Sequence, residues 1–199
     1  MKRPTDATSL PRRYPTLLAL GVLLACGIGL PTAAAGDDWS SFRGDPGMSG
    51  IAAGSLPETP VPLWTFQADF DIESTAAIAD GRVFVPSMAG TLYALDLDTG
   101  EELWRLETGE EIKSSPLVLD GVVYLGDEIG NFRAVDATSG ELLWTFVADA
   151  AISSSANYAD GCLLFGSYDA FIYCVERSSG ELRWKVETEG YVHGTPAIA

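Results

Sequence analysis

The sequence predicts an all-β protein built from a forty-residue repeat, and three observations support this prediction. Tryptophan recurs at a constant spacing of forty. Each period holds four short apolar segments separated by Gly-containing turns. One segment per period is continuously apolar, as is typical of a strand that is buried on both faces. A fixed period of this length indicates units that bury their apolar surface only by stacking on their neighbours.

The first complete period illustrates the four segments. Segment one spans residues 74–79 and ends at Asp80-Gly81, a pair that favours a two-residue hairpin turn. Segment two, residues 83–85, is the continuously apolar one. Segments three and four span residues 92–95 and the surroundings of Trp104, and the same arrangement returns forty and eighty residues later.

Four antiparallel strands per unit, stacked radially, describe the blade of a β-propeller. A Trp on the outer strand lies flat over the next blade only where small residues leave space, and Gly allows the left-handed turn between the last two strands. We therefore interpret one recurring set of residues as blade docking: Trp64, Trp104, Trp144, Trp184, Ala94, Ala134, Gly100, Gly140 and Gly180.

The chain divides into three parts. Residues 1–35 have a basic start, an apolar run and a small-residue site at Ala33-Ala34-Ala35, which predicts a signal peptide and an exported protein, periplasmic or secreted. An alternative is a lipoprotein box ending at Cys26, which would anchor the protein to the outer membrane by a lipid. Residues 36–60 form an irregular lead-in, and residues 61–199 carry the repeats.

Charge and cysteine usage limit the possible functions. The formal net charge of −16 disfavours nucleic acid and anionic membrane surfaces as partners. If Asp169-Ala170 is the turn, Cys174 lies opposite Phe165 and Cys162 faces the other side of the sheet, so we expect no disulfide between the two cysteines.

The motif Ala-x-Asp-x-x-Thr-Gly-x-x-x-Trp, which begins at Ala94 and follows an Asp-Gly-x-Val pattern, resembles the pyrroloquinoline-quinone (PQQ) type propeller repeat. The resemblance runs from Val61 to the C-terminus. It implies one of two kinds of protein: quinoprotein dehydrogenases, which hold PQQ with Ca²⁺, or non-catalytic propellers such as the assembly lipoprotein BamB. The adjacent cysteine pair of quinoprotein alcohol dehydrogenases is absent from the sequence.

The strand pattern also predicts an incomplete ring. Residues 63–66 match a fourth strand without the first three, and residues 194–199 match a first strand without the others. The resemblance implies a ring of about seven or eight blades, which about three complete blades plus two orphan strands do not close. We therefore expect this chain to be a fragment of a longer one.

Positions that differ between otherwise similar repeats are candidates for function. One such column lies just before the first segment of each blade and should point toward the mouth of the central channel: Glu73, Lys113, Ser153 and His193. Acidic residues near this column predict an acidic interaction face: Asp71, Glu111, Asp127, Glu128 and Asp169.

Three interpretations of this mouth compete. In the first, the propeller is a non-catalytic scaffold that binds a protein partner in the cell envelope, without cofactor or metal. In the second, the resemblance to quinoproteins implies that Glu73 helps to hold Ca²⁺, Lys113 faces a quinone oxygen and His193 acts as a base. In the third, the propeller is the sensor domain of a larger envelope system and binds a cationic ligand.

Overall fold

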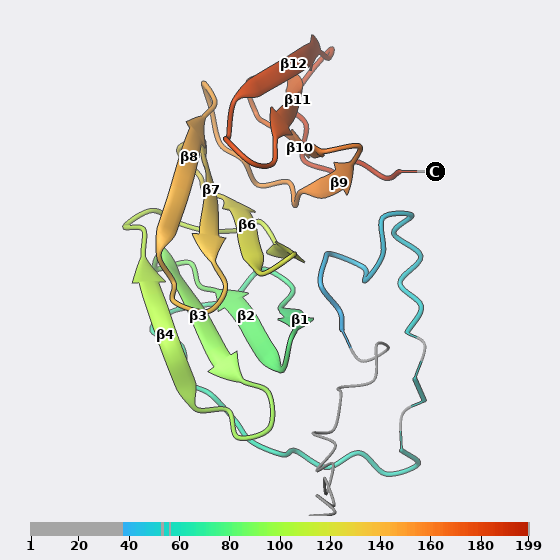
Figure 1. The fold of residues 1–199 in the computed structure, drawn as a ribbon, viewed down its shortest axis with the longest axis vertical. Coiled ribbons are helices and arrows are strands. Elements are labelled where there is room, and N and C mark those ends of the chain that lie inside the picture. The colour runs from blue at the N-terminus through green and yellow to red at the C-terminus, as the bar shows by residue number, and fades with distance from the viewer. Residues whose placement is uncertain (1–37, 53, 56, 199) are drawn as a thin grey trace, which may run out of the picture. The chain divides into compact units, whose positions relative to one another are not determined.

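A computed structural model describes residues 38–52, 54–55 and 57–198. The predicted signal peptide, its cleavage site and the possible lipidation site at Cys26 lie outside these residues. The described part contains twelve strands and no helix, and therefore no helix that could cross a membrane. The strands form three four-stranded antiparallel sheets (Figure 1). We refer to them as blades 1, 2 and 3.

Blade 1 comprises β1 (Ala77–Ala79), β2 (Arg82–Pro86), β3 (Thr91–Asp96) and β4 (Glu102–Glu107). Blade 2 comprises β5 (Leu117–Leu119), β6 (Val122–Gly126), β7 (Asn131–Asp136) and β8 (Leu142–Val147). Blade 3 comprises β9 (Asn157–Ala159), β10 (Cys162–Gly166), β11 (Phe171–Glu176) and β12 (Leu182–Glu187).

The predicted Asp-Gly hairpin turns are confirmed. Ala79 pairs with Arg82, so Asp80 and Gly81 are the two turn residues. Their φ angles are +51° and +70°, the left-handed values that a type I′ turn requires at both positions. The other two blades repeat this turn at Asp120-Gly121 and Asp160-Gly161, and each blade is therefore a tight meander.

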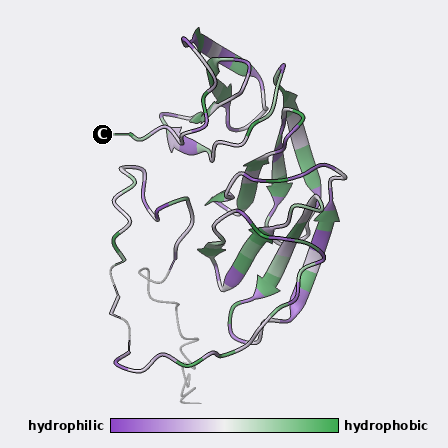
Figure 2. Cartoon of the chain, turned by 180° about the vertical axis from the view of Figure 1, so that it is seen from behind, coloured by the Kyte–Doolittle hydropathy of each residue, from purple (hydrophilic) through white to green (hydrophobic). Residues whose placement is uncertain are grey.

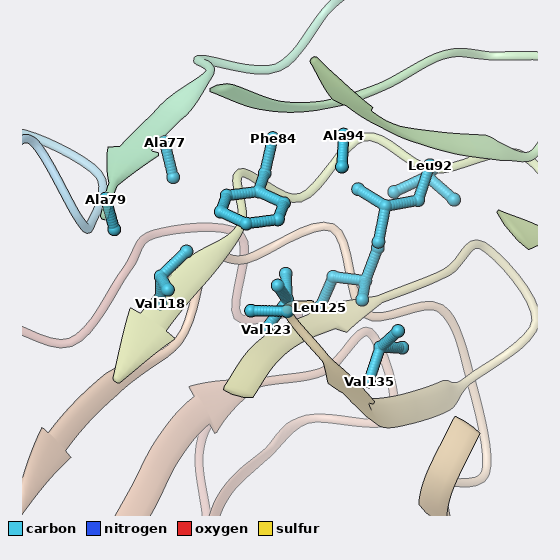
Figure 3. Close-up of a cluster of buried hydrophobic side chains, with 11 residues drawn as sticks. Ala77, Ala79, Phe84, Leu92, Ala94, Val118, Val123, Leu125 and Val135 are labelled. Atoms are coloured by element: carbon cyan, nitrogen blue, oxygen red, sulfur yellow. The ribbon is translucent and has the colours of Figure 1, made fainter. Parts of the chain in front are cut away.

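The core lies between neighbouring sheets. Figure 2 shows that apolar residues are concentrated on the strands. One cluster combines Phe84 and Leu92 of blade 1 with Val123 and Leu125 of blade 2, all buried. Phe84 projects from its sheet toward the blade 2 residues (Figure 3). Phe84 belongs to this cluster, whereas Val83 and Val85 belong to a second buried cluster, so β2 is buried on both faces and its continuous apolarity is explained.

Each blade is fastened to the next by a Trp side chain, and we call this contact the seam. Trp104 of blade 1 donates its indole N–H to the carbonyl of Ala137 in blade 2, at 3.1 Å. A Cβ added to Gly140 of blade 2 would lie 2.8 Å from the Trp104 ring, so only Gly fits below the indole. Trp64 over Gly100 and Trp144 over Gly180 repeat this geometry. Their indole N–H groups donate hydrogen bonds to backbone carbonyls at 2.9 and 3.2 Å, respectively.

The role of Ala94 differs from the expected one. Ala94 pairs with Trp104 across the strands of the same blade, where the β3–β4 register shifts by a bulge. The small residue that makes room for the indole on the neighbouring blade is Gly140, in the turn that follows β7. Ala94 is fully buried in the core of the seam instead.

The two predicted orphan strands do not join a sheet. Residues 63–66 and 194–198 form no β-ladder in the described structure. Trp64 nevertheless occupies its seam position, and Ser155 N–H donates to the hydroxyl of Thr195 at 3.2 Å. Side-chain docking therefore places both segments although their backbones lack ladder partners.

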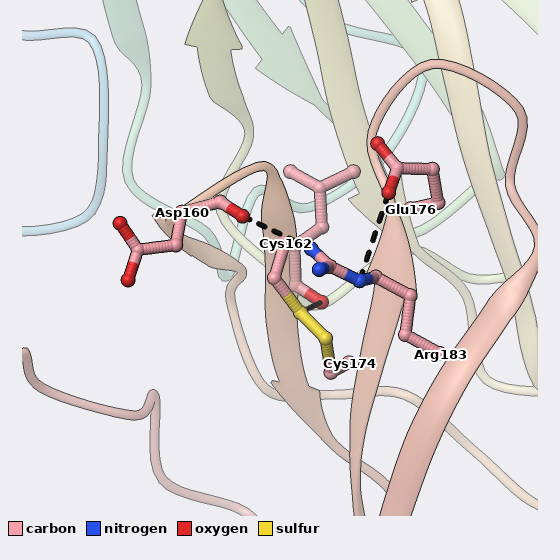
Figure 4. Close-up of a disulfide and its surroundings, with 6 residues drawn as sticks. Asp160, Cys162, Cys174, Glu176 and Arg183 are labelled. Atoms are coloured by element: carbon pink, nitrogen blue, oxygen red, sulfur yellow. Dashed lines mark hydrogen bonds and ion pairs between the residues drawn. A yellow bond between two sulfur atoms is a disulfide. The ribbon is translucent and has the colours of Figure 1, made fainter.

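Cys162 and Cys174 are joined by a disulfide, so the expectation that they would not pair is wrong (Figure 4). The register explains the error: Cys174 pairs with Leu164 rather than with Phe165. A register that differs by one residue moves a side chain to the opposite face of the sheet. Both cysteines therefore lie on the same face, with Cα atoms 5.5 Å apart.

The lead-in runs along the first strands of all three blades. Trp39 forms a two-way backbone bridge with Ile78 of blade 1, and the carbonyl of Ser40 accepts a bond from Val118 N–H of blade 2. The carbonyl of Pro46 accepts a bond from the side-chain amide of Asn157 in blade 3. The irregular lead-in thus covers strand edges that would otherwise be unpaired.

Candidate functional site

The loops at one end of the blades form the candidate site, and we call this surface the loop face. It consists of the β2–β3, β6–β7 and β10–β11 loops together with the segments that precede β1, β5 and β9 and the segment that follows β12, which is bonded to the β10–β11 loop through the Val192 N–H and the Ser167 carbonyl. Backbone hydrogen bonds join the loops within the blades to the segments between the blades. For example, the Glu128 N–H of the β6–β7 loop donates to the carbonyl of Glu111, which precedes β5, at 3.0 Å. Ile112 and Ile152 are fully buried below this surface and fix the segments in place.

An ionic cluster at the blade 2–blade 3 junction holds four of the candidate residues. Lys113 Nζ lies 3.1 Å from Glu128 Oε2 and 3.6 Å from Glu111 Oε2. The other oxygen of Glu128 accepts a bond from the Ser153 hydroxyl at 2.5 Å. The bond to Glu128 is the main cause that raises the pKa of Lys113, and the charges of Glu111 and Glu73 add to it. Lys113 therefore stays protonated and is shared among carboxylates.

Asp127 does not belong to the acidic interaction face, which is a correction to the sequence-based prediction. Its side chain is fully buried. Its carboxylate accepts bonds from Arg133 at 2.6 Å and from the backbone N–H and the amide of Asn131, both at 2.8 Å. Asp127 ties the β6–β7 loop together, because a buried carboxylate requires a paired charge and bonded oxygens.

Asp169 has a similar internal role at the corresponding loop of blade 3. It accepts the hydroxyl of Tyr173 at 2.5 Å and the backbone N–H of Asp149 at 3.1 Å. Burial and the bond to Asp169 raise the pKa of Tyr173 above its ordinary value. The acidic candidates that remain exposed on the loop face are Glu73, Asp71 and Glu111.

His193 lies apart from the ionic cluster, in an aromatic group that the sequence did not predict. Its ring is perpendicular to that of Tyr168, with ring centroids 5.8 Å apart, and Tyr168 stacks on Tyr191 with centroids 5.4 Å apart. The structure therefore brings Lys113, Ser153 and Glu128 together but places His193 with two tyrosines.

A second feature that the sequence did not predict is a series of hydrogen bonds that links one blade to the next. The N–H of Thr75 donates to the Ser115 hydroxyl at 2.9 Å, and the N–H of Ser115 donates to the Ser155 hydroxyl at 2.8 Å. Thr195 continues the chain as the acceptor for Ser155. The recurrence of hydroxyl residues at spacings of forty was the available signal.

Comparison with known families and structures identifies the chain. The family model described as "Outer membrane protein assembly factor BamB" matches residues 57–159 and 132–199. The chain belongs to this family of PQQ-like repeat proteins. A comparison with curated protein sequences finds no match.

Solved structures support the same fold. A quinohemoprotein alcohol dehydrogenase from Pseudomonas putida HK5 is similar with a TM-score of 0.67 and 18% identity, over 75% of this chain and 26% of that one. BamB from Moraxella catarrhalis gives 0.57 and 22%, over 63% and 39%. The designed Ika4 protein gives 0.62 and 18%, over 68% and 86%. The chain thus spans about a quarter to two fifths of the natural structures it resembles, and the likeness shows a β-propeller fold.

Proposed function

We propose that this protein is a non-catalytic propeller that binds a protein partner in the cell envelope through its loop face. The observation that carries the proposal is the mixture of exposed apolar and acidic side chains on that surface. Phe70 is 62% exposed, Ile129 55% and Tyr191 77%. Phe70 directly precedes the exposed Asp71, and the loop that carries Ile129 is bonded to the segment of the exposed Glu111 through the Glu128 N–H. Exposed apolar side chains flanked by charges are typical of protein-binding surfaces.

The family match supports this proposal, because the matching family model is named for an assembly factor. The chemistry of the surface also defines the partner. A protein segment with apolar side chains and Lys or Arg residues would complement Phe70, Asp71 and Glu111.

A pull-down from envelope extract tests the proposal. The double variant Asp71→Lys, Glu111→Lys reverses charge on the loop face, and Phe70→Ser removes an apolar contact. We expect both variants to lose a partner that the unchanged protein retains. Glu141→Lys is the control, because Glu141 is exposed in the turn at the opposite end of blade 2. Equal recovery with all four proteins would contradict the proposal.

A quinoprotein dehydrogenase is the second candidate, and the likeness to two quinohemoprotein alcohol dehydrogenases, with TM-scores of 0.67 and 0.64, favours it. The residues expected for PQQ and Ca²⁺ do not fit this role in the described part of the chain. Lys113, expected to face a quinone oxygen, is paired with the carboxylates of Glu128 and Glu111, and His193, expected to act as a base, lies against Tyr168 outside this ionic cluster. Within residues 38–198 as described, no group of three or more His, Cys, Asp or Glu residues is arranged to hold a metal. Equilibrium dialysis with PQQ and Ca²⁺ tests this candidate, and saturable retention of PQQ would revive it.

We also propose that the protein is exported. The basic, apolar and small-residue pattern of residues 1–35 supports export, as does membership of a family named for an outer-membrane assembly factor. Mass spectrometry of the mature N-terminus distinguishes the two routes. Cleavage after Ala35 gives a free Gly36, whereas lipoprotein processing gives a modified Cys26.

A further inference from the structure

A cavity of about 350 Å³ lies between blades 2 and 3, at the turn end of the strands and away from the loop face. Its volume is within the range of small-molecule sites, about 300–1,000 Å³. The apolar part of the wall is formed by Val122, Leu143 and Trp144, and four polar residues complete it: Asp120, Tyr124, Arg177 and Ser178.

Tyr124 presents a hydroxyl to this cavity. Its side chain is 2% exposed and packs against Trp144 at 5.8 Å. The two other fully buried tyrosines, Tyr93 and Tyr173, form hydrogen bonds within the protein. Among the described residues, the Tyr124 hydroxyl has no such bond, and no side-chain N or O atom is both sealed from solvent and unpaired. The hydroxyl therefore reaches the open space of the cavity and is available to a ligand.

Arg177 supplies a positive charge at the rim. Its guanidinium lies 5.5 Å from the Tyr158 ring, which restrains it, and it pairs with Asp120. The Asp120 side chain is 71% exposed, so this pair is weak and open to exchange. Within the described residues, Asp120 bonds to a single guanidinium nitrogen, Nη1, so the other N–H donors of Arg177 can meet a ligand carboxylate in the two-point arrangement that guanidinium favours.

The Tyr124 hydroxyl and the Arg177 guanidinium are specific to the seam between blades 2 and 3. The seam between blades 1 and 2 has Phe84 where this one has Tyr124, and Ala137 where this one has Arg177. The repeat thus preserves the blade architecture at both seams, and only one of them acquires a hydroxyl and a cation that face the same cavity.

We propose that this cavity binds a small monocarboxylate with an aromatic or branched apolar body. The carboxylate meets Arg177 and the Tyr124 hydroxyl, and the body lies against Val122, Leu143 and Trp144. The site is at the opposite end of the blade from the loop face, so it goes beyond the proposed partner binding and does not depend on it.

Titration of the ¹⁵N-labelled protein with phenylacetate at millimolar concentrations tests the proposal, with the Trp indole N–H signals as the readout. We expect a saturable shift of the Trp144 signal, and no saturable shift with the neutral isostere phenylacetamide. Tyr124→Phe should weaken binding about tenfold, the usual effect of losing one hydrogen bond to a charged group. Arg177→Ala should abolish binding.

Both variants carry the residue found at the blade 1–blade 2 seam, and unchanged signals of the other Trp residues verify their fold. Arg105→Ala is the matched control, since Arg105 is likewise an arginine paired with a carboxylate, that of Glu102, and lies outside the cavity. It should bind phenylacetate normally. The proposal is overturned if phenylacetate gives no saturable shift, if phenylacetamide binds equally well, or if Arg177→Ala binds like the unchanged protein.

Discussion

The covered seam of Trp144 and the open face of β12 carry the same sequence pattern and have different environments. Trp144 in β8 lies over Gly180 and donates its indole N–H to the Arg177 carbonyl. Trp184 in β12 is 46% exposed, and Leu182 and Val186 beside it are 47% and 55% exposed. No neighbouring blade covers β12 within the described residues. The repeat therefore fixes which side chain can dock, and the presence of a neighbour fixes whether that side chain is buried.

Removal of a seam Trp should have the largest effect on stability. We expect Trp104→Ala to lower the free energy of unfolding by about 3 kcal/mol, because it leaves a cavity and an unpaired Ala137 carbonyl. Trp184→Ala should cost less than about 1 kcal/mol, since that side chain is already half-exposed. Urea denaturation measures both. Equal losses would show that the contrast between covered and open faces has no energetic basis.

The glycine below the indole provides the second test. Gly140 has φ +75°, and an added Cβ would lie 2.8 Å from Trp104. We expect Gly140→Ala to cost about 2 kcal/mol, from left-handed backbone strain and displacement of the ring. Gly190→Ala is the control, because nothing lies within 4 Å of a Cβ there. A Gly140→Ala protein that unfolds like the control in urea would contradict the seam geometry.

The disulfide should matter most to the blade with the open face. Cys162 and Cys174 are separated by 12 residues and join β10 to β11 of blade 3. We expect the double variant Cys162→Ser, Cys174→Ala to lose about 2 kcal/mol. Hydrogen exchange should locate the loss in blade 3 rather than in blades 1 and 2. Peptide mass spectrometry without reductant checks the linkage itself, and two free thiols would refute it.

Acid should weaken the turns that support the seams, and we expect this loss of stability to be the smallest of those that we predict. Bonds from the backbone N–H and hydroxyl of Ser139 lower the pKa of Asp136 below its ordinary value of 3.8. Because the pKa is depressed in the folded state, this stabilisation is present above the unfolded value and is lost as the pH falls through the folded value. Asp136→Asn should therefore flatten the dependence of Tm on pH below about pH 4, and Ser139→Ala should do so partly. An unchanged acid slope in both variants would contradict this assignment.

Much of the fold is predictable from the sequence because its determinants are local or periodic. The Asp-Gly turns require positive φ at two adjacent residues, and the Trp spacing fixes the repeat. The candidate site is less predictable. Asp71 and Asp127 are both loop carboxylates in the sequence, yet one is exposed and the other is buried against Arg133. Arg133 lies six positions after Asp127, and only the fold of the hairpin between them brings the two side chains together.

By itself, the sequence determined the β-propeller repeat, the turns and the residues able to dock blade on blade, because these depend on backbone preference and on side-chain volume at a fixed period. The tertiary structure alone decided three other features: the disulfide, the burial of Asp127, and the cavity of Tyr124 and Arg177. The first depends on a register that differs by one residue. The other two depend on contacts between segments whose separation in the chain carries no periodic signal.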